Sequence, residues 1–174
     1  MIVDVRFVAP DLRRLDEASA EVVACGVYKD ERPMRGLAGL IDWRLAGRLS
    51  RLAKESFLVC DGGEVLALPA RPRLPFDKCI VVGLGPRRAF DEPGCRKALA
   101  RIVDALAGLH AKKALVEIPG RGDDAITPEQ AADVLFDATA SDALIVVERP
   151  DAQKRIEARL QEKRQKHARL EARS

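Results

Sequence analysis

The sequence has few aromatic residues, only two histidines and no long apolar run. Aromatic residues make up 4% of a chain in which 47% of residues are hydrophobic, so a core must be built mainly from Leu, Val, Ile and Ala. That composition is typical of a globular domain and argues against disorder over the body of the chain. No apolar run reaches the roughly 18 residues of a membrane span. Asp4 and Arg6 interrupt the start, where a signal peptide would need an apolar stretch. We therefore expect no membrane association and a cytoplasmic location.

The cysteines and histidines do not form a recognisable metal or disulfide pattern. The four cysteines never fall in a C-x-x-C spacing, and Cys25 and Cys79 lie in apolar, strand-like runs. They are therefore predicted to be small buried hydrophobic residues in a reducing compartment. Neither His110 nor His167 has a nearby Cys or His partner, which argues against a zinc site of the common kinds.

The positive charge of the chain is concentrated in its last residues. A chain of 174 residues fits a single domain of about 100–200 residues with a short appendage. Residues 151–174 hold eight Lys/Arg and four Asp/Glu, so 22 of the 30 basic and 23 of the 27 acidic residues remain in 1–150. The formal net charge of +3 therefore comes from the tail.

Hydrophobic periodicity predicts alternating strands and helices. Strands are expected at residues 2–8, 21–28, 64–69, 78–84, 113–118 and 143–148. Helices are expected at residues 11–18, 37–54, 92–109 and 127–140. Asp91 is a plausible cap for the third helix, and Thr127 to Gln130 form a capping-box pattern for the fourth. Six strands with helices between the later ones predict an α/β sandwich with a mostly parallel sheet. Any antiparallel pairing is expected from residues 1–28.

Several segments occur in an order that points to a known family. Asp30–Leu52 reads DERPMRGLAGLIDWRLAGRLSRL, and Asp77–Pro86 reads DKCIVVGLGP. A long Ala/Leu helix, a strand ending in Pro119-Gly120 and the strand ALIVVERP follow. Over most of residues 1–150, this ordered set resembles the amino-terminal domain of the M17 leucyl aminopeptidases. The resemblance implies a macro-domain-like fold, a three-layer sandwich with a six-stranded mixed sheet and helices on both faces.

The same resemblance divides the chain into two parts. Residues 1–150 correspond to the amino-terminal domain, and residues 151–174 correspond to the helix that links the two domains in the family. The tail contains strong helix formers and neither Gly nor Pro, and Asp151 is a plausible cap for it. We therefore expect a basic C-terminal helix, whose far half is either frayed or docked on a partner.

The resemblance does not extend to catalysis. M17 peptidases hold two metal ions in a catalytic domain, partly through a motif close to N-T-D-A-E-G-R. No such run occurs between Met1 and Ser174, so no catalytic or metal-binding residue of the family can be carried onto a position here. We expect no peptidase activity, no cofactor and no metal.

Two loops invite other readings, and the plainer interpretation is favoured for each. Gly83-Leu84-Gly85 follows a strand as dinucleotide-binding loops do, but the third glycine of that motif is missing and Pro86 removes one donor. A plain turn from strand to helix is the favoured interpretation.

The macro-domain resemblance raises ADP-ribose binding, but the Asn-rich strand end and the glycine-rich phosphate loop of macro domains are both absent. Asp123 and Asp124 could bind a cation, although adjacent carboxylates more often only solvate a loop.

The basic residues suggest an anion or nucleic-acid patch. Arg44, Arg48 and Arg51 are spaced to share one face of the helix predicted at 37–54, with Arg32 and Arg35 just upstream. The plainer interpretation is a solvated face that pairs with carboxylates such as Asp42 or Glu55. In the tail, the corresponding candidates are Arg164, Lys166 and Arg169.

Two functional hypotheses follow. The first is a non-catalytic interaction or regulatory module that assembles with itself or with a full-length M17 aminopeptidase. The second is a nucleic-acid-binding regulator that uses the basic helix and tail, as some M17 members bind DNA. An enzyme with an unrecognised active site ranks third, because no nucleophile with a paired base can be placed in the sequence.

Overall fold

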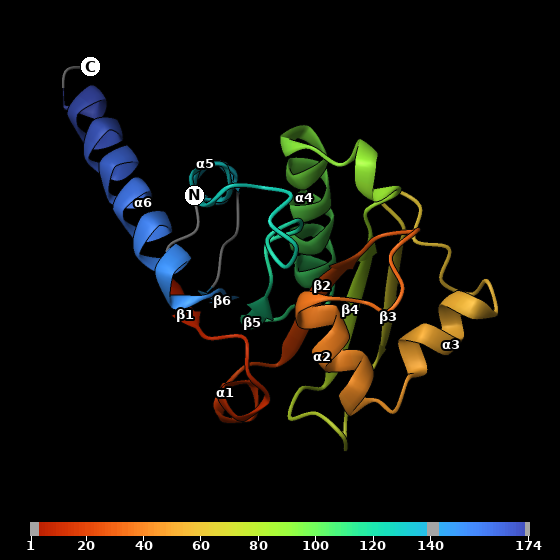
Figure 1. Ribbon diagram of the computed structural model, residues 1–174. Coiled ribbons are helices and arrows are strands. Elements are labelled where there is room, and N and C mark those ends of the chain that lie inside the picture. Colours follow the sequence, from red (N-terminus) through yellow and green to blue (C-terminus); the bar gives the residue numbers. More distant parts are fainter. Residues whose placement is uncertain (1–3, 139–142, 173–174) are drawn as a thin grey trace.

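One six-stranded sheet lies between two layers of helices (Figure 1). The structure is a computed structural model that describes residues 4–138 and 143–172. The strands are β1 (Val5–Val8), β2 (Val22–Val27), β3 (Val65–Pro69), β4 (Lys78–Gly83), β5 (Lys113–Val116) and β6 (Ala143–Val147). The α-helices are α1 (Leu12–Glu17), α2 (Gly36–Arg44), α3 (Arg48–Lys54), α4 (Glu92–Gly108), α5 (Pro128–Asp137) and α6 (Pro150–Glu171), and a short 3-10 helix, η1, spans Arg87–Ala89.

The sheet is mixed and mostly parallel, as expected. Its strand order is β1-β6-β5-β2-β4-β3, and every neighbouring pair is parallel except β3 with β4. The predicted source of antiparallel pairing was therefore wrong, because both strands of residues 1–28 pair in parallel. The antiparallel pair arises where the short connection 70–77 returns the chain directly from β3 to β4, whereas β1 and β2 are separated in the sheet by two other strands.

Successive residues of the central strands feed two separate cores. Val22 and Ala24 pack with the face covered by α4, α5 and α6, while Val23 and Cys25 pack with the face covered by α1, α2 and α3. Strand side chains alternate between the faces of a sheet, so a continuous apolar run is required when both faces are covered. All four cysteines are buried and free, as was predicted for Cys25 and Cys79.

The helix predicted over residues 37–54 is instead two helices. Ala46 and Gly47 have positive φ values of 55° and 74°, and this left-handed turn ends α2 and begins α3. The Asp42 carboxylate reaches across the break, accepting hydrogen bonds from the Ser50 hydroxyl and, at 3.1 Å, from the Ser50 amide. The prediction of one helix was wrong because the leucine spacing continues through a turn that needs glycine.

The cap predictions for the next two helices are confirmed. Asp91 accepts a hydrogen bond from the Gly94 amide at 2.9 Å and caps α4. Thr127 and Gln130 form a reciprocal capping box at the start of α5, with Pro128 in the first turn. The helix ends at Asp137, and the rest of its predicted range, 139–140, lies outside the described residues.

The tail forms one long helix that packs against α5. Arg149 is the N-cap residue and Pro150 begins α6, so the predicted cap at Asp151 was wrong; Asp151 lies within the first turn. The contact with the body buries Ala152, Ile156 and Leu160. None of the helices in the described part of the chain is long and apolar enough to cross a membrane.

Candidate functional site

The carboxyl ends of the parallel strands bring together residues from distant parts of the sequence, among them two glutamates. Tyr28 follows β2, Gly83 ends β4, Glu117 follows β5 and Glu148 follows β6. In open parallel sheets, ligands bind in the crevice outside these strand ends. We call this region the carboxyl edge, and it is the candidate site.

The loop Gly83-Leu84-Gly85 at this edge has no amide to offer a phosphate. The three amides donate in turn to the carbonyls of Glu64 at 2.8 Å, Val27 at 3.0 Å and Cys60 at 2.9 Å. A Cβ on Gly83 would lie only 2.1 Å from the Asp61 carbonyl oxygen, so glycine is required there for close backbone packing. This geometry supports the plain strand-to-helix turn.

Glu117 holds the start of α2 from across the sheet. Its Oε2 accepts a hydrogen bond from the Leu37 amide at 3.0 Å. A Cβ on Gly36 would lie 2.6 Å from Oε1, and Gly36 has a positive φ of 58°. Burial raises the pKa of the Glu117 carboxyl to about 8, the nearby charges of Glu148 and Asp123 also raise it, and the Leu37 amide opposes the shift.

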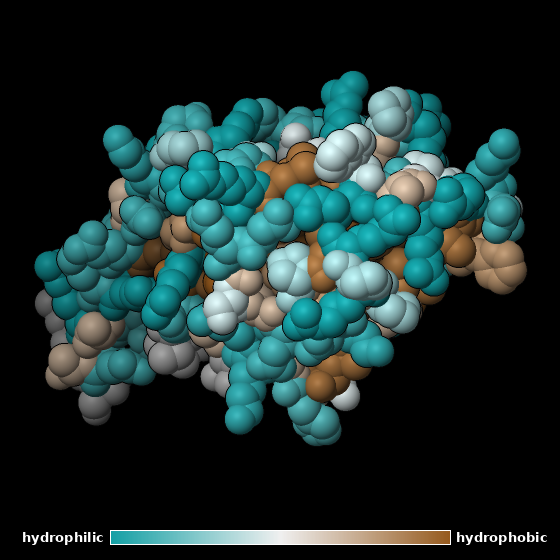
Figure 2. Space-filling view, turned by 90° about the horizontal axis from the view of Figure 1, so that it is seen from below, coloured by the Kyte–Doolittle hydropathy of each residue, from teal (hydrophilic) through white to brown (hydrophobic). Residues whose placement is uncertain are grey.

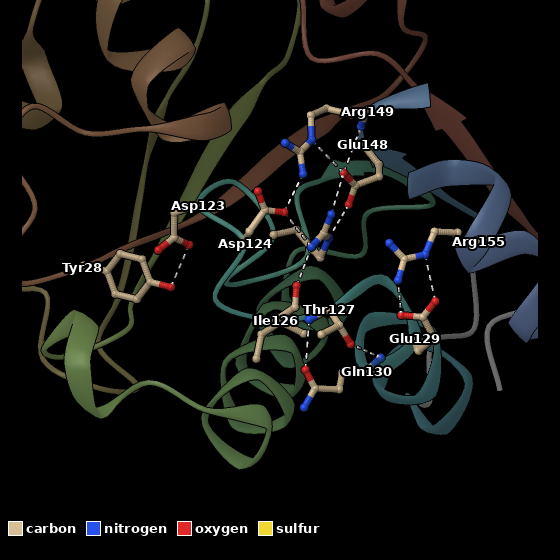
Figure 3. A network of polar contacts seen from close by, with 11 residues as sticks. Tyr28, Asp123, Asp124, Ile126, Thr127, Glu129, Gln130, Glu148, Arg149 and Arg155 are labelled. Carbon is tan, nitrogen blue, oxygen red and sulfur yellow. Dashed lines mark hydrogen bonds and ion pairs between the residues drawn. The ribbon is translucent and has the colours of Figure 1, made fainter. Parts of the chain in front are cut away.

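Tyr28 and Asp123 close the edge beside Glu117. The Tyr28 hydroxyl donates to Asp123 at 3.1 Å (Figure 3), and Arg87 pairs with the other carboxylate oxygen. Phe90 packs edge-on against the Tyr28 ring, with 5.3 Å between the ring centroids. Burial, followed by the Asp123 charge, raises the pKa of the Tyr28 hydroxyl well above its usual value. Tyr28, Asp123 and Glu117 are among the residues that line a cavity of about 20 Å³, which has room for about one water molecule.

A buried ion pair joins Arg121 of the loop after β5 to Glu148, and Figure 3 labels Glu148 with its neighbours Asp124 and Arg149. Nε and Nη2 of Arg121 donate to the two carboxylate oxygens of Glu148, at 2.7 and 3.2 Å. Arg121 is only 3% exposed and Glu148 only 4%. Arg121 also binds Asp124 and the Ile126 carbonyl, and Arg149 binds Asp124 from the start of α6. The network therefore fixes the loop after β5 to the junction of β6 and α6.

The adjacent carboxylates Asp123 and Asp124 do not share a ligand position. Asp123 faces Tyr28 and Arg87, whereas Asp124 faces Arg121 and Arg149. Across residues 4–138 and 143–172, no group of three or more His, Cys, Asp or Glu side chains is arranged to hold a metal ion. The two carboxylates serve in ion pairs that close the loop.

The sequence reasoning missed Glu117, Glu148 and Arg121. The available signal was a charged residue directly after an apolar strand, in VEIPG and in VVERP. Because a strand buried on both faces carries its last residues into the interior, a charge at that position needs a buried partner.

The predicted arginine face of residues 37–54 is divided by the break between α2 and α3. Arg44 forms a two-pronged ion pair with Asp16 of α1, at 2.9 and 3.0 Å. Arg48 and Arg51 instead line a groove on α3 together with residues of the β3–β4 connection. Neither Asp42 nor Glu55, the predicted carboxylate partners, forms an ion pair with these arginines within the described residues.

The tail candidates lie at the other end of the molecule. Arg164, Lys166 and Arg169 are exposed on the far half of α6, and Figure 1 places α6 and α3 at opposite ends of the sheet. The structure therefore does not join the two basic groups into one patch. In the middle of α6, Arg159 and Lys163 instead pair with Asp133 of α5.

The fold is that of a macrodomain-like α/β domain. A solved structure of a mutant Oceanobacillus iheyensis macrodomain matches with a TM-score of 0.72 and 12% identity, covering 93% of this chain and 92% of that one. The macrodomain of the same organism solved with ADP matches with a TM-score of 0.67 and 14% identity, covering 94% and 91%. A tomato leucine aminopeptidase mutant matches with a TM-score of 0.61 and 14% identity, covering 89% of this chain and 35% of that one.

The sequence comparison is more specific than the fold. Residues 22–141 match the cytosol aminopeptidase family, N-terminal domain, and the chain therefore belongs to that family. A probable cytosol aminopeptidase of Halorhodospira halophila is 34% identical over 105 residues, which are 59% of this chain and 21% of that protein. A probable cytosol aminopeptidase of Thioalkalivibrio sulfidiphilus is 27% identical over 136 residues, 76% and 27% respectively. The chain thus spans about a quarter or less of the length of these relatives, and the predicted M17 resemblance is confirmed.

Proposed function

We propose that this chain is a non-catalytic interaction or regulatory module that assembles with itself or with a full-length M17 aminopeptidase in the cytoplasm. The matched part of the family, residues 22–141, is its N-terminal domain, and the relatives are named cytosol aminopeptidases. Nucleotide binding is not part of the proposal, because the amides of Gly83, Leu84 and Gly85 donate to the chain's own carbonyls.

The observation that carries the proposal is the concentration of exposed apolar side chains on one stretch of the chain. Of the five large apolar side chains exposed in the described residues, three lie between residues 43 and 59: Trp43 at 71%, Phe57 at 72% and Val59 at 41%. Trp43 is the only tryptophan of a chain with few aromatics. Aromatic residues and arginine are enriched at the energetic centres of protein interfaces. Trp43 on α2 and Phe57 and Val59 after α3 are therefore the proposed contact residues.

The face of the molecule in Figure 2 is mainly polar, with a few small apolar patches. Seen from below the view of Figure 1, the molecule is covered mainly by hydrophilic side chains, and apolar atoms reach the surface in small, separate patches (Figure 2). Interfaces that form between folded proteins commonly combine a few apolar anchors with a polar rim. The partner is therefore expected to be a folded protein surface.

Sedimentation velocity of the chain alone and mixed with a full-length M17 aminopeptidase tests the proposal. We expect a species heavier than the monomer in at least one of the two samples, and roughly tenfold or greater weakening in Trp43→Ala and Phe57→Ala. Leu109→Ala, a change to an exposed leucine elsewhere, is the matched control and should leave assembly unchanged. A monomer that fails to sediment with the aminopeptidase at about 100 µM would contradict the proposal.

Peptidase activity provides a separate test. We expect no metal-dependent release of leucine from a leucine amide by the pure chain, since two-metal hydrolysis needs several converging carboxylates. Metal-dependent turnover that follows the chain through purification would show that the module is an enzyme.

A second candidate function is nucleic-acid binding through the tail. The specific observation is that Arg164, Lys166 and Arg169 are exposed and have no ion-pair partner within the described residues. Basic side chains that lie free on one helix can contact phosphates and release counterions. Retardation of duplex DNA should then weaken with added salt and disappear when these three residues are changed to glutamine. DNA that stays unbound at low salt would remove this candidate.

A further inference from the structure

A groove lined by four arginines lies next to the start of β4, at the end of the sheet opposite the carboxyl edge. Its volume is about 480 Å³, and it runs between α3 and the β3–β4 connection. Arg48 and Arg51 come from the helix, and Arg71 and Arg73 come from the connection. Apolar atoms complete the groove, contributed by Leu45, Leu52, Pro69, Ala70 and Pro72. Small-molecule sites have this range of volume, and charged groups in them orient the ligand.

Most of the positive charge in the groove is not balanced by the protein. Arg71 is paired with Asp77 at 2.7 Å. In the described part of the chain, no ion pair is formed by the side chains of Arg48, Arg51 or Arg73, and Glu55 is the one acidic residue in the lining. Gathering like charges around a hollow is unfavourable unless solvent or a bound anion offsets their repulsion.

Neighbouring contacts hold the two walls in place. The Arg51 guanidinium donates to the Ala46 carbonyl at 2.8 Å, which fixes it beside the groove and leaves its other donors unused. On the opposite side, Arg44 binds Asp16 while its guanidinium lies 3.5 Å from the Arg73 carbonyl oxygen. Arg44, which was predicted to share the patch with Arg48 and Arg51, thus contacts the wall of the groove through Arg73 and does not line it.

We propose that this groove binds a multiply charged phosphoryl anion, a polyphosphate or a phosphate ester. Guanidinium groups match phosphate oxygens in pairs of parallel hydrogen bonds, a geometry that lysine does not provide. Arg48 and Arg51, three residues apart on one helix face, supply donors from one wall. Arg73 supplies them from the other, so that one anion carrying two or more phosphoryl groups bridges both walls.

This site is separate from the carboxyl edge, and none of the proposed contact residues Trp43, Phe57 and Val59 lines it. The groove lies beside the residues that precede β4, whereas Gly83 ends that strand. The length of the strand places the two sites about 20 Å apart. Loss of anion binding therefore leaves the carboxyl edge and its hydrogen bonds unchanged.

Calorimetric titration of the full chain with pyrophosphate, tripolyphosphate and citrate tests the inference, with sodium chloride matched for ionic strength. We expect saturable binding of pyrophosphate or tripolyphosphate. Arg48→Gln and Arg73→Gln should each weaken it by roughly tenfold. Arg164→Gln, which removes the same charge from the exposed tail, is the matched control and should leave binding unchanged.

Three results would overturn the inference. The first is no saturable binding of either phosphate compound at millimolar concentration. The second is citrate binding as tightly as pyrophosphate, which would show a response to charge alone. The third is a native chain that binds duplex DNA but not pyrophosphate and that loses DNA binding in Arg48→Gln and Arg73→Gln. That result would identify the occupant as a nucleic acid. Assembly measured by sedimentation should remain intact in both groove variants, because Trp43, Phe57 and Val59 do not line the groove.

Discussion

At the residue scale, the carboxyl edge is governed by charges placed directly after buried strands. Glu117 binds the start of α2, and Glu148 pairs with Arg121 across the end of the sheet. Each of these side chains carries a cost of burial that its partner offsets only in the folded chain. They therefore influence stability more strongly than the more numerous ion pairs at the surface.

Changing Glu117 to glutamine should alter how stability depends on pH. The carboxyl has a pKa near 8 in the folded chain because it is buried, whereas in the unfolded chain it titrates near 4.5. Between these values the folded state holds a proton that the unfolded state has lost, so stability falls as pH rises, by up to about 1.4 kcal/mol per pH unit. The Glu117→Gln variant should lose this slope between about pH 4.5 and 8. Urea unfolding across this range checks the prediction, and equal slopes in both proteins would refute it.

Removing Arg121 should destabilise the fold strongly. Arg121→Met leaves the Glu148 carboxylate buried without its main partner, and the expected loss is about 3–5 kcal/mol of unfolding free energy. Changing both residues, Arg121→Met with Glu148→Leu, should recover much of that loss because no unpaired charge remains. Chemical denaturation of the single and double variants measures both effects. A single variant as stable as the parent would show that the pair contributes little.

At the element scale, the break between α2 and α3 decides where the arginines lie. The left-handed turn at Ala46 and Gly47 separates Arg44 from Arg48 and Arg51. Arg44 is thereby free to reach Asp16 on α1, and the other two turn toward the β3–β4 connection. The groove exists because the helix does not continue.

Replacing Gly47 with alanine tests the importance of this turn. Because Gly47 has a φ of 74°, we expect Gly47→Ala to destabilise the chain by roughly 1 kcal/mol. Gly108→Ala is the matched control, since Gly108 lies in α4 and a Cβ added there would meet only open space. That change should be neutral or should stabilise by about 0.5–1 kcal/mol. Thermal unfolding of both variants distinguishes them, and equal shifts would mean that the turn carries no special strain.

The sequence was sufficient for elements whose signals are local. The caps at Asp91 and Thr127 depend on residues within one helical turn, and both were predicted correctly. The helix break and the antiparallel β3–β4 pair were not, because leucine spacing is unaffected by a left-handed turn and pairing depends on the order of strands in space. The contacts of Glu117 with Leu37 and of Glu148 with Arg121 join residues far apart in the chain. No local pattern specifies such partners.

At the scale of the whole molecule, the charged and apolar features are divided among separate regions. The carboxyl edge is filled by its own side chains, with a cavity of about 20 Å³. The arginine groove lies at the opposite edge, the exposed aromatic residues lie on α2 and after α3, and the basic half of α6 extends from the far end (Figure 1). The proposed role in protein contacts rests on this division of the surface.

The most direct test of that account is the mass of the native chain in solution, alone and with a full-length M17 aminopeptidase, measured by light scattering after size-exclusion chromatography. The account predicts a homo-oligomer or a complex with the aminopeptidase, and Trp43→Ala should reduce the amount of either. The 19.1 kDa mass of a single chain in both samples, with no change in the elution of the aminopeptidase, would contradict it.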